Sequence, residues 1–456
     1  MVKFLHYFKN LWFGGNKKVT KSNSIVITTS ATAPLAVASK RKEIVMNVIQ
    51  TSSKGAACLL LMFLSLKSNA QLTKTAFIKA QQQCKDMLLV TKDPAKPPRT
   101  TRPDGTLAFS PDIYDWTSGF FAGSLWYTYE ATRDETLKAE ALRYTEVLDS
   151  LQYFTGHHDI GFMLYCSYGN GYRLTHNEKY KDVLVQGAKS LCKRFNPATG
   201  CIKSWNQRLS WDGKTMWHYP VIIDNMMNLD LLFFASKMTG DTSFKHIAVT
   251  HALTTMKNHI RPDYSTYHVV DYDAKTGKVL HQETCQGYAN NSTWARGQAW
   301  SIYGFTSVYK ETGDKQFLET AQHLADFYLN NTRLPKDKIP YWDFNANQPG
   351  FQPQFNYDAT KYKEIPRDVA AAAVVASALF DLSKLSDVKK GEGYKKAAIE
   401  IVKSLASPKY TAEVGTNNNF ILKHATGSLP HNQEIDKPLV YADYYYLEAL
   451  LKYSKL

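Results

Sequence analysis

Two aspartates have sequence surroundings that suit acid–base chemistry on a bound substrate. Asp224 lies in the apolar run Val221-Ile222-Ile223-Asp224-Asn225-Met226-Met227. Such surroundings disfavour the charged carboxylate and raise its pKa, so that the group can hold a proton for general acid catalysis. Asp159 follows two histidines in the segment Gly156-His157-His158-Asp159. Two carboxyl groups at one site can divide proton donation and substrate positioning between them.

Each aspartate also has a purely structural interpretation. Aspartate is common at the start of a helix, where its side chain accepts hydrogen bonds from free backbone N–H groups. On position alone, this capping role is the more frequent one for Asp224 and for Asp159. The chemical interpretation therefore depends on the two carboxyl groups meeting at one pocket.

An arginine and several tryptophans accompany the two acids. Arg296, in the motif Arg296-Gly297-Gln298-Ala299-Trp300, suits a bidentate contact with the carboxylate of an acidic sugar. Its alternative role is a salt bridge to an aspartate of a neighbouring helix. Trp116, Trp205 and Trp300 can stack on sugar rings, although each can equally be an ordinary core side chain. Carboxylates, aromatic rings and an arginine together are typical of a sugar-binding site.

These residues must be positioned by helices, because helical periodicity dominates from Gln71 to Leu456. Two turns nearly repeat, at residues 236–241 and 309–314, and each ends one helix with Gly and begins the next with Asp. A looser version of this turn lies at residues 131–135. The predicted helices lie near residues 73–90, 115–131, 134–150, 159–172, 176–195, 222–238, 242–258, 293–311, 314–330, 368–386, 391–406 and 440–454.

The twelve predicted helices alternate in character. The even-numbered ones are rich in Gly, Ala and aromatic residues, as expected of helices packed on all sides, whereas the odd-numbered ones have a polar face. Six such hairpins predict an all-α fold, an (α/α)6 barrel, in one domain over residues 71–456, with loops and short strands at its rim. If all inner helices point the same way, their starts meet at one mouth of the barrel, and the candidate residues stand at those starts.

The charge of the chain does not indicate a nucleic-acid partner. The formal net charge is +14, but residues 1–70 contain ten of the 55 Lys and Arg residues and one of the 41 acidic residues. The remainder therefore carries only about +5, which removes most of the support for nucleic-acid binding.

The basic N-terminal region has its own interpretation. Residues 46–70 combine a basic start, a short apolar stretch and small residues before Gln71, the pattern of a secretory signal peptide, which predicts a periplasmic location. The twelve apolar residues at 55–66 are too few to span a bilayer, which needs roughly 20, so no membrane span is expected after cleavage. Residues 1–45 are interpreted as a non-native or disordered extension.

The cysteines do not have the spacing of a metal site. There is no Cys-x-x-Cys motif and no Cys/His cluster among Cys84, Cys166, Cys192, Cys201 and Cys285. Cys192 and Cys201 bracket a turn and can either form a disulfide or remain packed thiols.

The motifs at the predicted inner-helix starts resemble those of glycoside hydrolase family 88, in the family's order and over roughly residues 75 to 455. The matching motifs are Asp115-Trp116-Thr117-Ser118-Gly119-Phe120, His158-Asp159-Ile160-Gly161-Phe162, Ile222-Ile223-Asp224, Arg296-Gly297-Gln298-Ala299-Trp300, Tyr341-Trp342-Asp343-Phe344, Arg367-Asp368 and Tyr441-Ala442-Asp443-Tyr444-Tyr445. The resemblance implies an unsaturated glucuronyl hydrolase, which removes a 4,5-unsaturated glucuronic acid from the non-reducing end of lyase-generated glycosaminoglycan oligosaccharides.

The resemblance also implies roles for individual residues. Asp224 would protonate C4 of the enol ether and then help to deprotonate the water that adds at C5, while Asp159 would hold the ring hydroxyls. The resemblance implies neither a metal ion nor an organic cofactor. The implied substrate contacts are His158, Trp116, Asp115, Trp205, His268, Gln286, Arg296 and Trp300.

The loop at residues 424–434 would contact the second sugar through Ser428, His431 and Asn432. Family members that favour sulfated substrates often have Lys and Ser in this loop, where this chain has Leu429 and Asn432. The preferred glycosaminoglycan therefore stays open, as does the oligomeric state.

Three alternatives remain from the sequence. An unsaturated rhamnogalacturonyl hydrolase would use the same barrel on pectin fragments, but the His158-Asp159 pair and the motif at residues 298–300 favour the glucuronyl enzyme. A sugar epimerase on the same toroid would need paired histidines, and the inner-helix starts carry mainly aspartates. A non-catalytic sugar-binding protein is the third alternative.

Overall fold

The structure is a computed structural model that describes residues 70–353 and 355–456. The predicted extension at residues 1–45 lies outside the described residues. The same holds for the predicted signal peptide at residues 46–70, apart from its last residue. Within the described part, no helix is long and apolar enough to cross a membrane.

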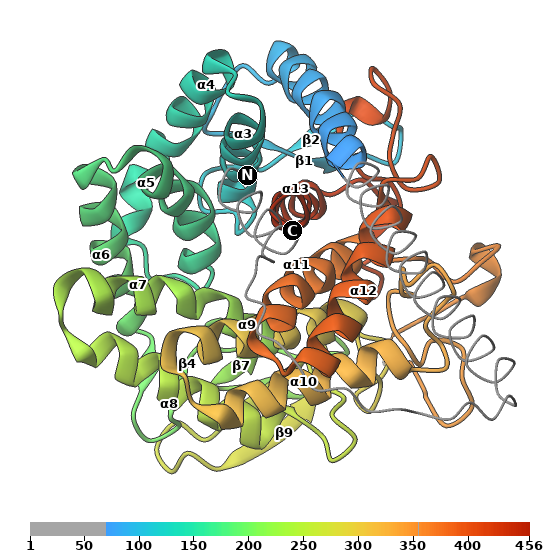
Figure 1. Ribbon diagram of the computed structural model, residues 1–456. Coiled ribbons are helices and arrows are strands. Elements are labelled where there is room, and N and C mark those ends of the chain that lie inside the picture. The colour runs from blue at the N-terminus through green and yellow to red at the C-terminus, as the bar shows by residue number, and fades with distance from the viewer. Residues whose placement is uncertain (1–69, 354) are drawn as a thin grey trace, which may run out of the picture. The chain divides into compact units, whose positions relative to one another are not determined.

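The described helices form a closed ring of hairpins (Figure 1). This arrangement confirms the predicted (α/α)6 barrel, and the helices lie within a few residues of their predicted positions. In chain order they are 70–90, α3 (Ser118–Thr132), α4 (Glu135–Glu146), η2 with α5 (Gly161–Gly169, Asn170–Thr175), α6 (Glu178–Cys192), η3 with α7 (Ile223–Asn228, Leu229–Thr239), α8 (Thr242–His259), α9 (Ala295–Thr312), α10 (Lys315–Asn330), α11 (Val369–Leu385), α12 (Val388–Leu405) and α13 (Val440–Ser454).

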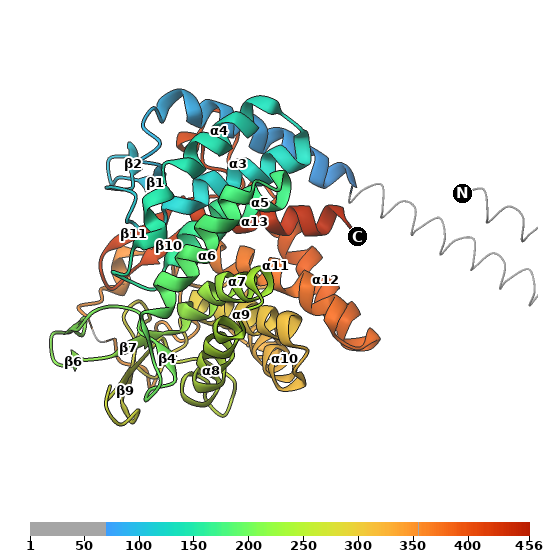
Figure 2. The same cartoon turned by 90° about the vertical axis from the view of Figure 1, so that its left-hand side faces the viewer.

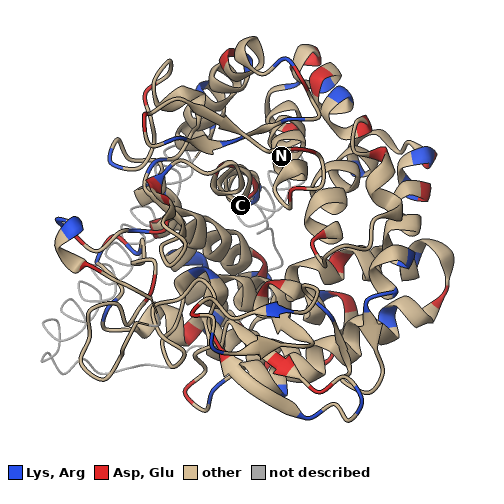
Figure 3. Ribbon diagram, turned by 180° about the vertical axis from the view of Figure 1, so that it is seen from behind, with Lys and Arg blue, Asp and Glu red and all other residues tan. Residues whose placement is uncertain are grey.

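Inner and outer helices alternate as the composition predicts. The inner helix α11 buries 13 of its 17 residues, mostly Ala and Val, whereas its outer partner α12 buries 7 of 18. Most charged residues lie on the outer ribbons and loops, as Figure 3 shows. The apolar core therefore lies between the two rings of helices and among the inner ones.

The repeated turns are made as predicted. After α7 and α9, Gly240 and Gly313 adopt φ values of 77° and 70°, and Asp241 and Asp314 then accept hydrogen bonds from the first turns of α8 and α10. In the looser version, Arg133 takes the left-handed conformation instead of a glycine.

Short strands surround one end of the ring (Figure 2). Four hairpins and one three-stranded sheet are present among the described residues. The pairs are β1–β2 (Pro98–Thr101, Leu107–Phe109), β3–β4 (Phe195–Asn196, Cys201–Ile202), β5–β6 (Arg208–Leu209, Met216–Trp217) and β10–β11 (Ala425–Ser428, Gln433–Lys437), and the sheet is β7–β8–β9 (Pro220–Ile222, Val269–Tyr272, Val279–Glu283). Strand β7 leads directly into η3, so this end is where the inner helices begin.

Two inner helices begin later than predicted. Helices were expected from residues 115 and 159, but α3 begins at Ser118 and η2 at Gly161. Asp115 instead makes a turn, in which it accepts a 2.9 Å hydrogen bond from the backbone N–H of Thr117. The candidate residues therefore project from the loops that precede the helices.

Cys192 and Cys201 do not form a disulfide. Both are free thiols, and Cys201 is fully buried. Of the two alternatives from the sequence, the packed thiols are the ones the structure contains.

The conformation of Gly313 yields a stability test with a matched control. A Cβ atom at Gly313 or at Gly393, in the exposed middle of α12, would meet no atom within 4 Å, so only backbone preference differs between them. We expect Gly313→Ala to lower the free energy of unfolding by about 1 kcal/mol, because φ is positive there. Gly393→Ala should raise it by about 0.5–1 kcal/mol. Urea unfolding measures both changes, and a stabilised Gly313→Ala protein would contradict this assignment.

Candidate active site

A cavity of about 210 Å³ opens at the mouth where the inner helices begin. The sequence-predicted residues that line it are Trp116, His158, Asp159, Trp205, Asp224, Gln286, Arg296, Ser428 and His431. Segments from across the whole chain therefore converge on one space. Both aspartates face it, which is the condition on which their chemical interpretation depended.

Asp224 does not cap a helix. It lies in the first turn of η3, where no side chain caps the helix start, and its Oδ2 is buried with no hydrogen-bond partner among the described residues. Burial raises the pKa of Asp224 to about 7, and the nearby charge of Asp159 adds to the rise, while Arg296 opposes it. Close to neutral pH, this carboxyl group is therefore poised to carry and release a proton.

The neighbours of Asp159 lower its pKa, whereas the surroundings of Asp224 raise the pKa of that group. Burial alone would raise its pKa, but His158 and His157 more than offset this effect, and the pKa of Asp159 is lowered. His157 Nδ1 lies 3.1 Å from Asp159 Oδ2, and His158 Nε2 lies 3.2 Å from Oδ1. The two acids at this cavity thus have pKa values shifted in opposite directions. This pattern makes one of them a proton donor and leaves the other ionised.

His268 lies behind Asp224 and does not line the cavity. Its Nδ1 accepts hydrogen bonds from the backbone N–H groups of Cys285 (3.0 Å) and Gln286 (3.2 Å). Burial lowers the pKa of His268 well below its ordinary value, so the ring is neutral and carries its proton on Nε2. That nitrogen lies 3.8 Å from Asp224 Oδ2. His268 therefore faces the acid itself, and the predicted direct substrate contact is corrected to a supporting position.

Three other predicted contact residues also lie outside the cavity wall. Trp300 is buried, with its ring 5.3 Å from that of Phe162, because it belongs to the packed layer of α9. The carboxylate of Asp115 is bonded to Arg99 and Thr117. Asn432 is exposed in the turn between β10 and β11, where its backbone N–H donates to Leu429 O.

Arg296 makes the salt bridge that the sequence left as its alternative role. Its Nη1 contacts Asp368 and donates to Thr426 O (2.6 Å), and its Nη2 donates to Gly427 O (2.5 Å). These bonds tie α9 to the start of α11 and to strand β10. A guanidinium has five N–H donors, so these three bonds leave two unused, and Arg296 lines the cavity.

Several cavity residues were not predicted. Arg99 lies in β1 and bridges Asp115 and Glu434, with a 2.6 Å hydrogen bond from its Nε to Glu434. Arg208 lies in β5, with its guanidinium carbon 5.0 Å from the ring centre of Trp205. The others are Ile222, Cys285 and Gln433. Arg99 and Arg208 lie between predicted helices, and their basic side chains were the only signal that the sequence offered for them.

The described residues hold no group of three or more His, Cys, Asp or Glu side chains that could bind a metal ion.

Comparison with known proteins shows to which family the chain belongs. Residues 98–333 match the family described as Glycosyl Hydrolase Family 88. The chain belongs to glycoside hydrolase family 88. It is 44% identical over 343 residues to the "Unsaturated glucuronyl hydrolase" of Formosa agariphila, a match that covers 75% of this chain and 80% of that protein. It is 33% identical over 351 residues to the "Unsaturated chondroitin disaccharide hydrolase" of Streptococcus agalactiae, covering 75% and 82%.

Solved structures of the family give the same result. An unsaturated glucuronyl hydrolase specific for heparin is 48% identical, with a TM-score of 0.76 over 85% of this chain and 97% of that one. A mutant of the Streptococcus agalactiae enzyme, complexed with dGlcA-GalNAc6S, is 28% identical, with a TM-score of 0.67 over 84% and 91%. Membership of the family confirms the resemblance seen in the motifs and supports a hydrolase rather than an epimerase.

The raised pKa of Asp224 predicts a specific pH dependence of stability. The folded protein keeps a proton on Asp224 that the unfolded chain releases above the ordinary pKa of 3.8, so the contribution of Asp224 to wild-type stability falls as the pH rises from about 4 to about 7. Asp224→Asn removes this loss and should gain stability relative to the wild type over that range. Thermal unfolding at a series of pH values measures the difference. The variant Asp112→Asn, at an exposed position, is the control. A stability difference between Asp224→Asn and the wild type that does not change with pH would contradict the assignment.

Proposed function

We propose that this enzyme removes a 4,5-unsaturated glucuronic acid from the non-reducing end of lyase-generated glycosaminoglycan oligosaccharides. The observation that carries the proposal is the pair Asp224 and Asp159, which line one cavity and whose pKa values are shifted in opposite directions. The relatives support the same substrate class, since their names specify glucuronyl or chondroitin disaccharide hydrolases.

The reaction begins with proton transfer from Asp224 to C4 of the enol ether. A carboxyl group that is half-protonated near neutral pH meets the requirement of general acid catalysis, because it is protonated in a large fraction of molecules and still releases its proton readily. Positive charge then develops at C5 and on the ring oxygen. The ionised Asp159 stabilises that charge and holds the ring hydroxyl groups.

Water completes the reaction at C5. After protonation of C4, Asp224 is a carboxylate and takes a proton from the water molecule that attacks C5, which restores the starting state of the acid. The resulting hemiketal opens to a ketone at C5, which leaves a hemiacetal at C1. Its collapse to an aldehyde breaks the glycosidic C1–O bond and releases the second sugar, whose oxygen keeps the hemiacetal proton. His268, whose Nε2–H faces Asp224 Oδ2, stabilises the carboxylate form in the middle of the cycle.

The remaining residues bind and orient the unsaturated sugar. The two free N–H donors of Arg296 and the amide of Gln286 suit its carboxylate. Trp116 and Trp205, both half-buried, offer apolar faces for the sugar rings. Ser428 and His431, joined by a 2.5 Å hydrogen bond, lie on the side formed by the C-terminal hairpin and suit the second sugar.

The rhamnogalacturonyl alternative shares the chemistry but not the substrate. The names of the relatives favour the glycosaminoglycan fragments. Turnover of an unsaturated chondroitin or heparin disaccharide, compared side by side with an unsaturated rhamnogalacturonan disaccharide, distinguishes the two.

Replacing Asp224 tests the proposed reaction directly. Asp224→Asn should lower turnover at least about a hundredfold, because the amide cannot supply the proton. It should still bind the disaccharide, because the other contacts remain. The assay follows loss of the near-ultraviolet absorbance of the enol ether, and equilibrium dialysis measures binding. Asp112→Asn is again the control. Full activity of Asp224→Asn would contradict the proposal, and so would persistence of the absorbance with the wild type on every disaccharide.

A further inference from the structure

The arginines of the cavity differ in whether their charge is balanced. Arg296 is buried and paired with Asp368, and Arg99 is paired with Asp115 and Glu434. Arg208 is exposed, and in the described part of the chain its guanidinium has neither an acidic partner nor a hydrogen-bond acceptor, only the indole of Trp205. Its positive charge is thus held at the cavity and is available to a ligand.

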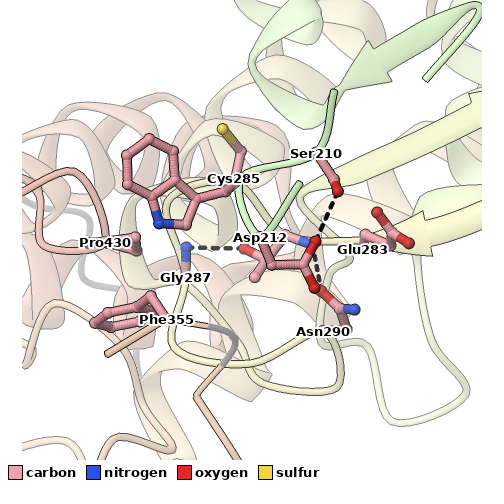
Figure 4. Close-up of a pocket in the computed structure, with 10 residues that line it drawn as sticks. Ser210, Asp212, Glu283, Cys285, Gly287, Asn290, Phe355 and Pro430 are labelled. Carbon is pink, nitrogen blue, oxygen red and sulfur yellow. Dashed lines mark hydrogen bonds between the residues drawn. The ribbon is translucent and has the colours of Figure 1, made fainter. Parts of the chain in front are cut away.

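The hairpin that carries Arg208 is well anchored. Glu283 of β9 accepts hydrogen bonds from Thr215 Oγ1 (3.0 Å) and Trp217 Nε1 (2.6 Å). In the turn, Ser210 Oγ donates to Asp212 Oδ1 at 2.7 Å. Figure 4 shows this turn beside Cys285 and Pro430, where three segments of the rim meet. An arginine on such a support loses little further freedom when it binds an anion.

Arg208 lies on the side of the cavity where the second sugar is expected. Trp211, three residues further along the same hairpin, packs its ring 3.6 Å from that of His431, the neighbour of Ser428 in the C-terminal hairpin. Asp224 is nearly buried, whereas Arg208 is exposed at the opening. A terminal sugar whose reacting atoms reach Asp224 therefore leaves the next sugar toward Arg208.

We propose that Arg208 is a specificity-determining residue that binds a sulfate ester on the second sugar. A planar guanidinium with free donors binds a tetrahedral oxyanion through two parallel hydrogen bonds. The inference rests on the proposed function, because it assigns the recognition of the leaving sugar at the same cavity. It places the anion receptor on hairpin β5–β6 rather than on the loop at residues 424–434.

The test uses the full chain and a panel of unsaturated disaccharides whose second sugar carries no sulfate or a single sulfate ester. We expect the wild type to have a lower KM for at least one sulfated member than for its unsulfated counterpart. Arg208→Gln should lose about tenfold in kcat/KM on that sulfated substrate, through KM, and less than about twofold on the unsulfated one. The kcat/KM of Arg208→Lys on the sulfated substrate should lie between those of the wild type and Arg208→Gln.

The control removes a positive charge from the same hairpin. Lys214 pairs with Asp212, is largely exposed and does not line the cavity, so Lys214→Gln should leave the ratio between sulfated and unsulfated substrates unchanged. Equal losses for Arg208→Gln on both substrates, an equal change in Lys214→Gln, or a wild type that favours no sulfated member would each overturn the inference while leaving the proposed function intact. Absence of wild-type turnover across the whole panel would instead overturn both.

Discussion

The removal of the Asp224 carboxyl group from water is the constraint on which the rest of the site depends. A carboxylate loses much of its hydration when it is buried, and in the described part of the chain no hydrogen bond to Oδ2 replaces that loss. The group therefore keeps its proton to about pH 7. The cost is tolerable because the neutral acid is compatible with its Ile and Met neighbours. Asp159, in the same cavity wall, keeps its charge because two histidines contact it.

The barrel reconciles this burial with access for a substrate. The inner helices bury most of their residues against one another and against the outer ring, while their starts face the rim, where short strands and loops lie. The buried pair of Arg296 and Asp368 fixes the rim to this scaffold, because the same guanidinium also binds two carbonyl groups of strand β10. Buried pairs of this kind are a weak source of stability. In this site the pair defines where the C-terminal hairpin stands, and so the shape of the cavity.

The fold was largely predictable from the sequence because its signals are local. Gly–Asp turns and alternating helix composition located the helices. Because the inner helices all run in the same direction, their starts share one end of the barrel, and this brings Asp159, Asp224 and Arg296 together. What failed depended on tertiary surroundings. His268 and Trp300 were expected in the cavity wall but lie behind it, since the motif cannot tell a side chain that touches the ligand from one that supports its neighbour. Arg99 and Arg208 were missed because two-residue or four-residue strands have no distinctive pattern, and because Glu434, one partner of Arg99, is far away in the chain.

The site depends on one acid of the cavity holding a proton near neutral pH while the other is ionised. Infrared difference spectroscopy observes the C=O stretch of a protonated carboxyl group directly, and single variants assign it. At a pH well below 7 but above the ordinary aspartate pKa of 3.8, burial keeps Asp224 protonated while Asp159 is ionised. We expect a protonated-carboxyl band to disappear in Asp224→Asn and no such band to disappear in Asp159→Asn. Loss of the band in Asp159→Asn, or no change in Asp224→Asn, would contradict this assignment of the proton.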